Sequence, residues 1–396
     1  MVLAPTRGAA AGLVVAIAAA SAIVVLSKAT AASNIKSKLP NPTVRLSNGV
    51  LLPLVAVGTG MPPPRAVMED VVPMALDIGF THFDASCVEY GNEAELGDAL
   101  AQQPRDAFFL TTKIDPPFGP IGDGAYNIWP PDVAYAETMT QVRSCLKAHR
   151  VTHFDLLILH KPPGDPWAAF TPGKAHPGKP LTDYECTSMR ETWRAMQDIY
   201  KAGTARAIGV SNFCPSTFEC LTSGFDAADL VMPMVNQVQY HVGMGADSGG
   251  IRTYSEENGI ALQAYSPLAL RRPVEGSSTE LITGELVNSI GAKYGKTGAQ
   301  VALRWLVQRD ISVAVQSASQ SHLFDDLDLF DFALSDEDVA ALDAAASPGG
   351  HYSFKCGLGP SPAPPLPPCA WWLGPPCASS WAEVHNLRLE SEDEGE

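Results

Sequence analysis

Short apolar segments alternate with helical patterns along most of this chain, and that alternation restricts the folds open to it. Eight segments have the length and the β-branched or aromatic content of buried strands. They cover residues 54–57, 81–84, 108–113, 154–160, 207–211, 234–237, 261–265 and 311–315. Eight strand–helix units spread over about 300 residues predict a parallel (β/α)8 TIM barrel.

A doubly wound sheet is the main alternative fold, and the turn after the first strand argues against it. Such sheets carry a Gly-x-Gly-x-x-Gly turn there, whereas this chain reads Gly58-Thr59-Gly60-Met61-Pro62-Pro63. Before that strand, residues 43–53 read as strand, Asn48-Gly49 turn and strand, which predicts a β-hairpin. We expect this hairpin to close the bottom of the barrel.

Two helices can be placed from their spacing. Apolar residues at steps of three and four predict a helix through Met189 and Trp193 that ends at Gly203, and another helix is predicted over residues 300–308. The segment 291–297 resembles a phosphate-binding loop, but it is one residue short and follows a helical pattern. We therefore predict a helix that ends at Gly295.

The two ends of the chain differ in composition from the barrel. Residues 9–26 are apolar or small and lie between Arg7 and Lys28, which is roughly the ~18 residues that span a bilayer. A small-x-small cleavage pattern follows at residues 29–31. We predict a leader and linker over residues 1–42, the barrel over residues 43–346 and an irregular, Pro-rich, acidic-ended tail over residues 347–396.

The leader leaves three alternatives open: a cleaved signal peptide, an organelle-targeting segment and an uncleaved transmembrane helix. The expected localisation is accordingly the secretory pathway, an organelle or a membrane, with membrane attachment through the apolar segment. The net charge of −16 disfavours nucleic acid as a partner, and we expect a monomer.

The eight cysteines are irregularly spaced and form no Cys-x-x-Cys pair, so a zinc site has little support and no metal is expected. Cys356, Cys369 and Cys377 lie in the Pro-rich tail and could pair in an oxidising compartment, but free thiols are their expected state. We expect Cys87 to be a packed, inert thiol.

Four residues at or just beyond strand ends carry the candidate chemistry: Asp84, Tyr90, Lys113 and His160. In a TIM barrel the C-terminal strand ends face the active site. A free tyrosine titrates near ~10, so it needs a neighbouring cation to serve as an acid at neutral pH. Lys113, paired with Asp84, would supply that cation, and His160 would donate a hydrogen bond to the substrate oxygen.

These four residues resemble the catalytic tetrad of the aldo-keto reductases, barrel enzymes that transfer a hydride from NAD(P)H to a carbonyl. Later strand ends resemble the same family, at Gly209-Val210-Ser211-Asn212-Phe213, at residues 236–241 and at Ala264-Tyr265-Ser266-Pro267-Leu268. The resemblance implies that Ser211, Asn212 and Gln237 hold the nicotinamide carboxamide and that Tyr265 stacks on its ring. Ser266 and Leu268 complete this end of the expected cofactor site.

The chain departs from the family where the adenosine 2′-phosphate of NADPH would bind. The family has Lys and Arg at positions where this chain has Gln316 and His322, followed by Asp325 and Asp326. With Ser317, these residues are the expected contacts of the adenosine end. A phosphate beside carboxylates and without these cations is poorly held. This weakens the family's usual preference for NADPH, and we expect NADP(H) or NAD(H) as the cofactor.

Three further departures concern the substrate side. Tyr90 lies six positions after Asp84, where the family has five, so the loop must absorb one residue. Gly60 and Lys161 stand where the family often has aromatic residues, which predicts a wider, cationic pocket. Trp129 and Trp167, in two long loops, are expected to refill it. The expected substrate contacts are therefore His160, Lys161, Trp129 and Trp167.

The resemblance implies an NAD(P)H-dependent oxidoreductase that reduces a small aldehyde or ketone to an alcohol, with the proton supplied by Tyr90. The alternative is a barrel of low turnover that binds nucleotide as a redox sensor or accessory subunit. The complete tetrad favours the enzyme, whereas the altered adenosine site favours the alternative.

Overall fold

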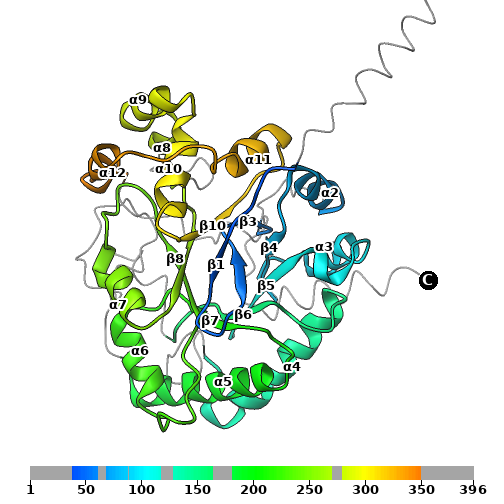
Figure 1. Ribbon diagram of the computed structural model, residues 1–396. Coiled ribbons are helices and arrows are strands. Elements are labelled where there is room, and N and C mark those ends of the chain that lie inside the picture. The colour runs from blue at the N-terminus through cyan, green and yellow to red at the C-terminus, as the bar shows by residue number, and fades with distance from the viewer. Residues whose placement is uncertain are drawn as a thin grey trace, which may run out of the picture. The chain divides into compact units, whose positions relative to one another are not determined.

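Eight parallel strands close into a barrel in the order β10-β3-β4-β5-β6-β7-β8-β9 (Figure 1). The structure is a computed structural model, and it describes residues 38–60, 68–87, 89–116, 128–163, 181–269 and 279–348. The barrel strands are β3 (Val55–Gly58), β4 (His82–Asp84), β5 (Phe109–Ile114), β6 (Leu156–Leu159), β7 (Ile208–Ser211), β8 (Val235–Gln239), β9 (Ala261–Tyr265) and β10 (Ser312–Val315). The predicted TIM barrel is confirmed, and each of the eight predicted segments supplies one strand.

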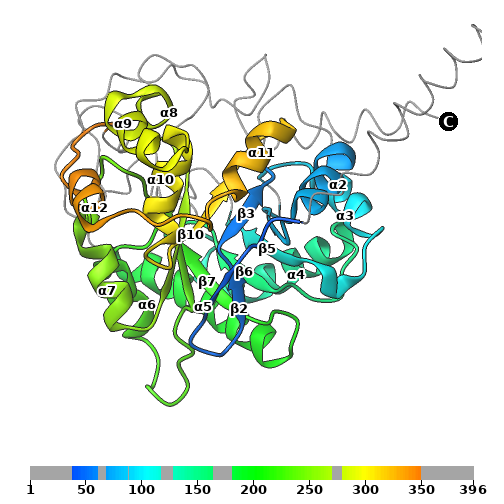
Figure 2. The same ribbon diagram turned by 45° about the horizontal axis from the view of Figure 1, so that its top comes forward.

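Helices surround the barrel on its outside (Figures 1 and 2). They are α2 (Met68–Ile78), α3 (Glu93–Leu100), α4 (Pro131–Ala148), α5 (Asp183–Lys201), α6 (Pro215–Thr222), α7 (Ile251–Glu257), α8 (Glu280–Thr283), α9 (Glu285–Tyr294), α10 (Gly298–Val307), α11 (Gln320–Leu327) and α12 (Asp336–Asp343), with short 3-10 turns η1 (Arg105–Ala107) and η3 (Ser248–Gly250). Both predicted helices are present as α5 and α10. Helix α9 ends as predicted at Gly295, whose φ of 67° is the left-handed conformation that glycine adopts freely.

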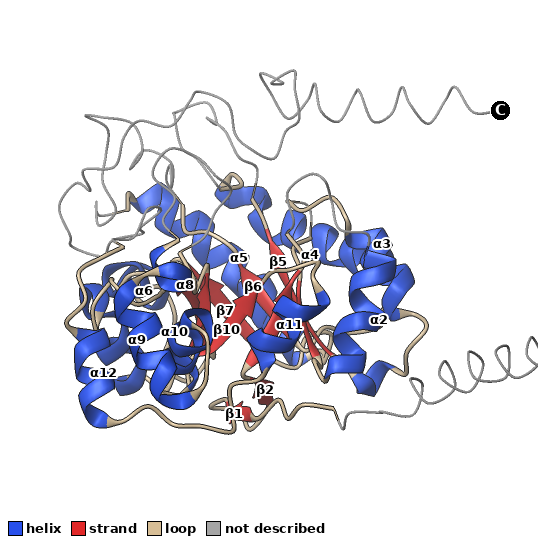
Figure 3. Cartoon of the chain, turned by 90° about the horizontal axis from the view of Figure 1, so that it is seen from above, coloured by secondary structure: helices blue, strands red, loops and turns tan. Residues whose placement is uncertain are grey.

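The predicted hairpin lies at the N-terminal end of the barrel, where β1 (Thr43–Arg45) pairs with β2 (Leu51–Pro53) (Figure 3). The carbonyl oxygen of Pro53 accepts a hydrogen bond from Ser312 Oγ at 3.2 Å and lies 3.2 Å from His82 Nδ1. Both residues begin barrel strands, so the hairpin is fastened beneath the barrel. Burial lowers the pKa of His82 to about 4, which keeps its ring neutral in this apolar setting.

Two disulfides join cysteines of the described residues, and one of them shows that the expectation of an inert thiol at Cys87 is wrong. Cys87 is bonded to Cys145 of α4, and Cys186 of α5 is bonded to Cys220 of α6. The partners are separated by 58 and 34 residues in sequence. Their pairing depends on which helix packs beside which loop, and irregular spacing in the sequence carries no sign of it.

The predicted leader and most of the predicted tail lie outside the described residues. Within the described part of the chain, no helix combines the length and the hydropathy needed to cross a bilayer. The apolar segment 9–26 is not among those residues, so its role stays a prediction.

Asp155, which directly precedes β6, binds β5 and residues just before β5 and β7 at the N-terminal end of the barrel. Its carboxylate, with a side chain only 2% exposed, accepts hydrogen bonds from Arg105 and Arg206 at 2.6 Å each. It also accepts a bond from the backbone N–H of Leu110 in β5 at 2.8 Å. A buried carboxylate with this many donors is stabilised chiefly because its charge is fully met.

We therefore expect Asp155→Asn to lower the free energy of unfolding by about 3 kcal/mol, because two guanidinium groups would lose their counter-charge. The matched control is Asp98→Asn, which breaks an ion pair with Arg150 in which both side chains are more than half exposed. It should cost less than about 1 kcal/mol. Denaturant unfolding of both variants measures the difference, and equal losses would contradict this account of Asp155.

Candidate active site

The C-terminal ends of β4, β5 and β6 bring together the polar residues expected there. Asp84 is the last residue of β4, Lys113 is the penultimate residue of β5, and His160 directly follows β6. In a closed barrel of parallel strands these ends share one face. These three residues, which are far apart in the sequence, are therefore neighbours in space.

Lys113 and Asp84 form a buried ion pair at the centre of this face. Lys113 is fully buried, and its Nζ donates to Asp84 Oδ1 at 2.5 Å and to the carbonyl oxygen of Ala85 at 2.8 Å. The other oxygen of Asp84 accepts a hydrogen bond from Gln237 Nε2 at 2.7 Å. Each charge is thus met by an opposite charge and by further hydrogen bonds, as a buried pair requires.

Tyr90 lies next to this pair despite the extra residue in its loop. Lys113 Nζ donates a third hydrogen bond to Tyr90 Oη at 3.4 Å and lies 5.2 Å from the centre of the tyrosine ring. The rings of Tyr90 and His160 meet edge to face with their centres 6.3 Å apart. The structure therefore brings all four residues of the predicted tetrad together.

Gly60 provides the space for the ring of Tyr90. A Cβ atom at position 60 would lie 2.8 Å from Cζ of Tyr90, which is closer than non-bonded carbon atoms approach. The tyrosine ring fills the space that a side chain at position 60 would take. The wider pocket expected from Gly60 stays a prediction.

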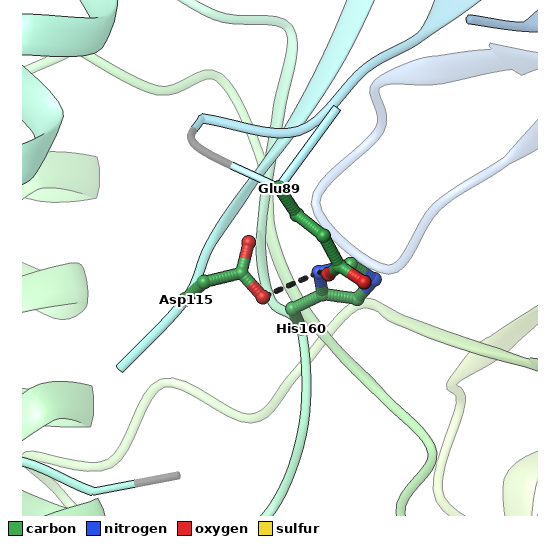
Figure 4. A group of neighbouring side chains, drawn as sticks. All are labelled: Glu89, Asp115 and His160. Atoms are coloured by element: carbon green, nitrogen blue, oxygen red, sulfur yellow. Dashed lines mark hydrogen bonds and ion pairs between the residues drawn. The ribbon is translucent and has the colours of Figure 1, made fainter. Parts of the chain in front are cut away.

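Two carboxylates hold the ring of His160 (Figure 4). Its Nδ1 lies 2.6 Å from Asp115 Oδ1 and 2.8 Å from Glu89 Oε2. Burial acts to lower the pKa of His160, but the charges of Asp115 and Glu89 outweigh burial, and the pKa lies above its ordinary value. The imidazolium form is thus favoured in this setting.

Lys161 completes this charged cluster, where two carboxylates offset the positive charge expected from it. Its Nζ lies 2.8 Å from Glu89 Oε2 and 3.7 Å from Asp115 Oδ1. Burial opposes the charge of Lys161, but Glu89 and Asp115 raise its pKa above the usual range. The charges of Lys161 and His160 in turn outweigh burial and hold the pKa of Glu89 well below its usual range. Two cations and two carboxylates therefore balance.

Glu89, Asp115 and His160 have ligand atoms within 4.8 Å of one another, a spacing that a metal ion could bridge. The donor set argues for ion pairs instead. The ammonium of Lys161 already contacts Glu89 at 2.8 Å, and a His160 ring that is protonated at Nδ1 offers no lone pair there. We therefore derive no chemistry through a metal at this cluster.

The predicted nicotinamide contacts form a hydrogen-bonded group at the ends of β7, β8 and β9. Asn212 Nδ2 donates to the carbonyl oxygen of His160 and to Ser211 Oγ at 3.0 Å each, and Tyr265 Oη donates to Asn212 Oδ1 at 2.8 Å. Gln237 donates through Nε2 to Asp84 and Gln263, so its carbonyl oxygen is the group that remains to accept. Hydroxyl, amide and ring groups of this kind fit a carboxamide on an aromatic ring.

Two other predicted contacts lie directly beyond β9. Ser266 has a φ of 50°, a left-handed conformation that turns the chain sharply there. Leu268 is half-buried. Both stay predicted cofactor contacts.

The predicted adenosine contacts lie around the start of α11. Gln316 and His322 are exposed, and Ser317 and Asp325 are half-buried. Asp326 is buried, and burial, followed by the charge of Asp325, raises its pKa to about 7. The raised pKa favours the protonated form of Asp326 and so weakens the negative charge expected from this pair.

The predicted tryptophans are only partly placed. Trp129 is buried, and its carbonyl oxygen accepts a hydrogen bond from Ser188 of α5 at 2.6 Å. Trp167 lies outside the described residues. A contact of either residue with substrate stays a prediction.

Glu89 and Asp115 are site residues that motif comparison missed. A usable signal was present, because Asp115 stands two positions after Lys113 and Glu89 directly precedes Tyr90. Charged residues just beyond barrel strands point to the active-site face, even where no family motif includes them.

Comparison with known proteins agrees with this geometry. The sequence model of the aldo/keto reductase family matches residues 56–347. Glyoxal reductase from Bacillus subtilis (strain 168) is 29% identical over 304 residues, which cover 76% of this chain and 92% of the relative. Aldo-keto reductase family 1 member A1-A from Danio rerio is 31% identical over 317 residues, covering 76% and 89%.

A solved structure extends the likeness to three dimensions. The crystal structure of a Bombyx mori aldo-keto reductase in complex with NADP matches with a TM-score of 0.60 and 26% identity, over 77% of this chain and 92% of that chain. The barrel, the residues at its strand ends and these matches together show that the chain belongs to the aldo/keto reductase family.

Proposed function

We propose that this protein reduces a small, polar aldehyde or ketone to the alcohol with a reduced nicotinamide cofactor. The observation that carries the proposal is the contact of Tyr90 Oη with Lys113 Nζ at 3.4 Å, in a lysine that is itself fixed to Asp84. The NADP bound to the Bombyx mori enzyme supports the choice of cofactor. When bound, the cofactor supplies a hydride to the carbonyl carbon.

The protein supplies the proton and the charge stabilisation. As negative charge develops on the carbonyl oxygen, Tyr90 transfers its phenolic proton to that oxygen, and the product is an alcohol. The ammonium of Lys113 stabilises the phenolate that remains. His160 donates a hydrogen bond to the same oxygen, and Asn212, Ser211 and Gln237 orient the carboxamide so that one ring face meets the substrate.

The cluster around His160 supports a small, hydrogen-bonding substrate. On that side of the site, each of two cations lies within 3.7 Å of each of two carboxylates. Such groups lose water when an apolar substrate covers them, and that loss is costly unless the substrate offers hydrogen bonds in return. The relative named glyoxal reductase is consistent with a small substrate of this polarity.

Replacing Tyr90 by Phe tests the mechanism. We expect carbonyl reduction to fall by roughly 10²–10⁴-fold, because the only proposed proton donor is lost. Cofactor affinity should stay nearly unchanged, because the strand ends that hold the nicotinamide are intact. Turnover against an aldehyde panel and cofactor fluorescence quenching measure the two effects. Unimpaired turnover would remove Tyr90 from the mechanism, and a wild-type protein that binds cofactor without turnover would favour the sensor or accessory role.

We further propose that NADPH has little or no advantage over NADH. The double variant Gln316→Lys plus His322→Arg should shift the affinity ratio towards NADPH by at least about tenfold, since each charge-assisted hydrogen bond is worth about 1.5–3 kcal/mol. In the unmodified protein the ratio should also rise as pH falls from 8 to 6, because Asp326 has a pKa of about 7 and loses its charge over that range.

Asp326→Asn is the matched control for the cofactor titrations, because it keeps the shape of the side chain and should abolish the part of the pH dependence that Asp326 causes. A strong NADPH preference in the unmodified protein would contradict the proposal, as would a double variant that leaves the ratio unchanged.

We also propose that the barrel works in an oxidising compartment. Two disulfides support this, because reducing compartments rarely maintain structural disulfides. Protein isolated from its source under acid quench and alkylated without reductant should carry no label on Cys87, Cys145, Cys186 or Cys220. Labelling of all four would place the protein in a reducing environment.

A further inference from the structure

The side chains around His160 determine which of its ring nitrogens carries a proton. Nδ1 is within 2.6 Å of Asp115 Oδ1 and within 2.8 Å of Glu89 Oε2, and both of these atoms are carboxylate oxygens. Asp115 Oδ2 accepts a further hydrogen bond from Ser86 Oγ at 2.7 Å, which fixes the plane of that carboxylate. An ionised carboxylate accepts hydrogen bonds and donates none, so Nδ1 must carry a proton.

A neutral histidine has one proton on its ring. If that proton stays on Nδ1, Nε2 carries a lone pair and cannot donate to a carbonyl oxygen, which is itself an acceptor. The imidazolium form carries a proton on each nitrogen. It alone can satisfy the carboxylates through Nδ1 and donate to a substrate through Nε2.

The charges that face His160 come from three strand ends. Glu89 lies on the loop after β4, Asp115 follows β5, and Lys161 follows His160 itself. Lys161 opposes the imidazolium charge, but its Nζ is bound to Glu89 at 2.8 Å.

The phenol of Tyr90 also faces this ring, with the two ring centres 6.3 Å apart, and it connects His160 to the Asp84–Lys113 pair. From β7, the neutral amide of Asn212 binds the carbonyl oxygen of His160 at 3.0 Å.

We propose that Glu89 and Asp115 are positioning residues that hold His160 as an imidazolium, with its Nε2–H presented to the carbonyl oxygen of the substrate. The proposal rests on the proposed function for the substrate it names, but the state of His160 can be measured without turnover. It assigns Asp115 and Glu89 a defined part in the reaction although neither touches the reacting atoms. It also implies that the rate of reduction falls at alkaline pH because His160 loses a proton there.

The experiment is a pH titration of the full chain with ¹⁵N-labelled histidine, with His160 assigned by comparison with His160→Asn. In the unmodified protein, both ring nitrogens of His160 should report the imidazolium with a midpoint above that of free histidine. Glu89→Gln and Asp115→Asn should each lower the midpoint by roughly one pH unit or more, because each removes a charge in contact with the ring. Asp115→Glu keeps the charge and should largely restore the midpoint.

A second measurement follows the rate. The alkaline limit of kcat for aldehyde reduction should move to lower pH with the midpoint in both variants, while cofactor affinity stays unchanged. Asp98 is an exposed carboxylate outside the cluster, so Asp98→Asn should change neither the midpoint of His160 nor the alkaline limit of kcat.

A His160 midpoint at or below that of free histidine would overturn the proposal, as would a midpoint that does not respond to the double variant Glu89→Gln plus Asp115→Asn. A rate limit that stays fixed while the midpoint moves would overturn it as well. If no carbonyl is reduced at all, the proposed function fails. The nitrogen titration still decides whether Glu89 and Asp115 hold His160 as an imidazolium. Should either single variant not fold, Ser86→Ala loosens Asp115 without removing its charge, and it should lower the midpoint by a smaller amount.

Discussion

The ion pair between Asp84 and Lys113 is the interaction on which the rest of the site depends. Both groups are buried, and an uncompensated buried charge costs several kcal/mol. Their hydrogen bonds remove that cost and also link elements, because Asp84 ends β4, Lys113 belongs to β5, and the Gln237 amide that binds Asp84 comes from β8. These bonds fix the position of the Lys113 ammonium, and Tyr90 Oη contacts it there.

The second group of charges has a different consequence for chemistry. A lone Lys161 would have favoured an anionic substrate, but its contact with Glu89 at 2.8 Å cancels that preference. The four charges beside His160 sum to zero, which supports the proposed preference for a substrate that forms hydrogen bonds. The same pairing makes the imidazolium of His160 tolerable away from bulk water, since its charge is met by two carboxylates in direct contact.

Periodicity and turn signals predicted the barrel, the hairpin and the end of α9, because these depend on local patterns that repeat along the chain. The tetrad was predictable since barrel topology maps strand ends to one face. Glu89 and Asp115 were not recognised, because their role comes from contact with His160 across three loops. The Cys87–Cys145 bond was missed for a similar reason, as it joins a loop to a helix 58 residues further along the chain.

Two departures from the family pattern that look independent in the sequence are in contact in the structure. The loop from Asp84 to Tyr90 is a residue longer than the family pattern, and Gly60 lacks the aromatic side chain that the family often has there. In space, a Cβ atom at position 60 would lie 2.8 Å from the ring of Tyr90. The longer loop brings the tyrosine ring over position 60, and glycine is the residue that leaves room for it. Tyr90 still reaches Lys113 at 3.4 Å from this longer loop, so the contact on which the proposed proton transfer depends is kept.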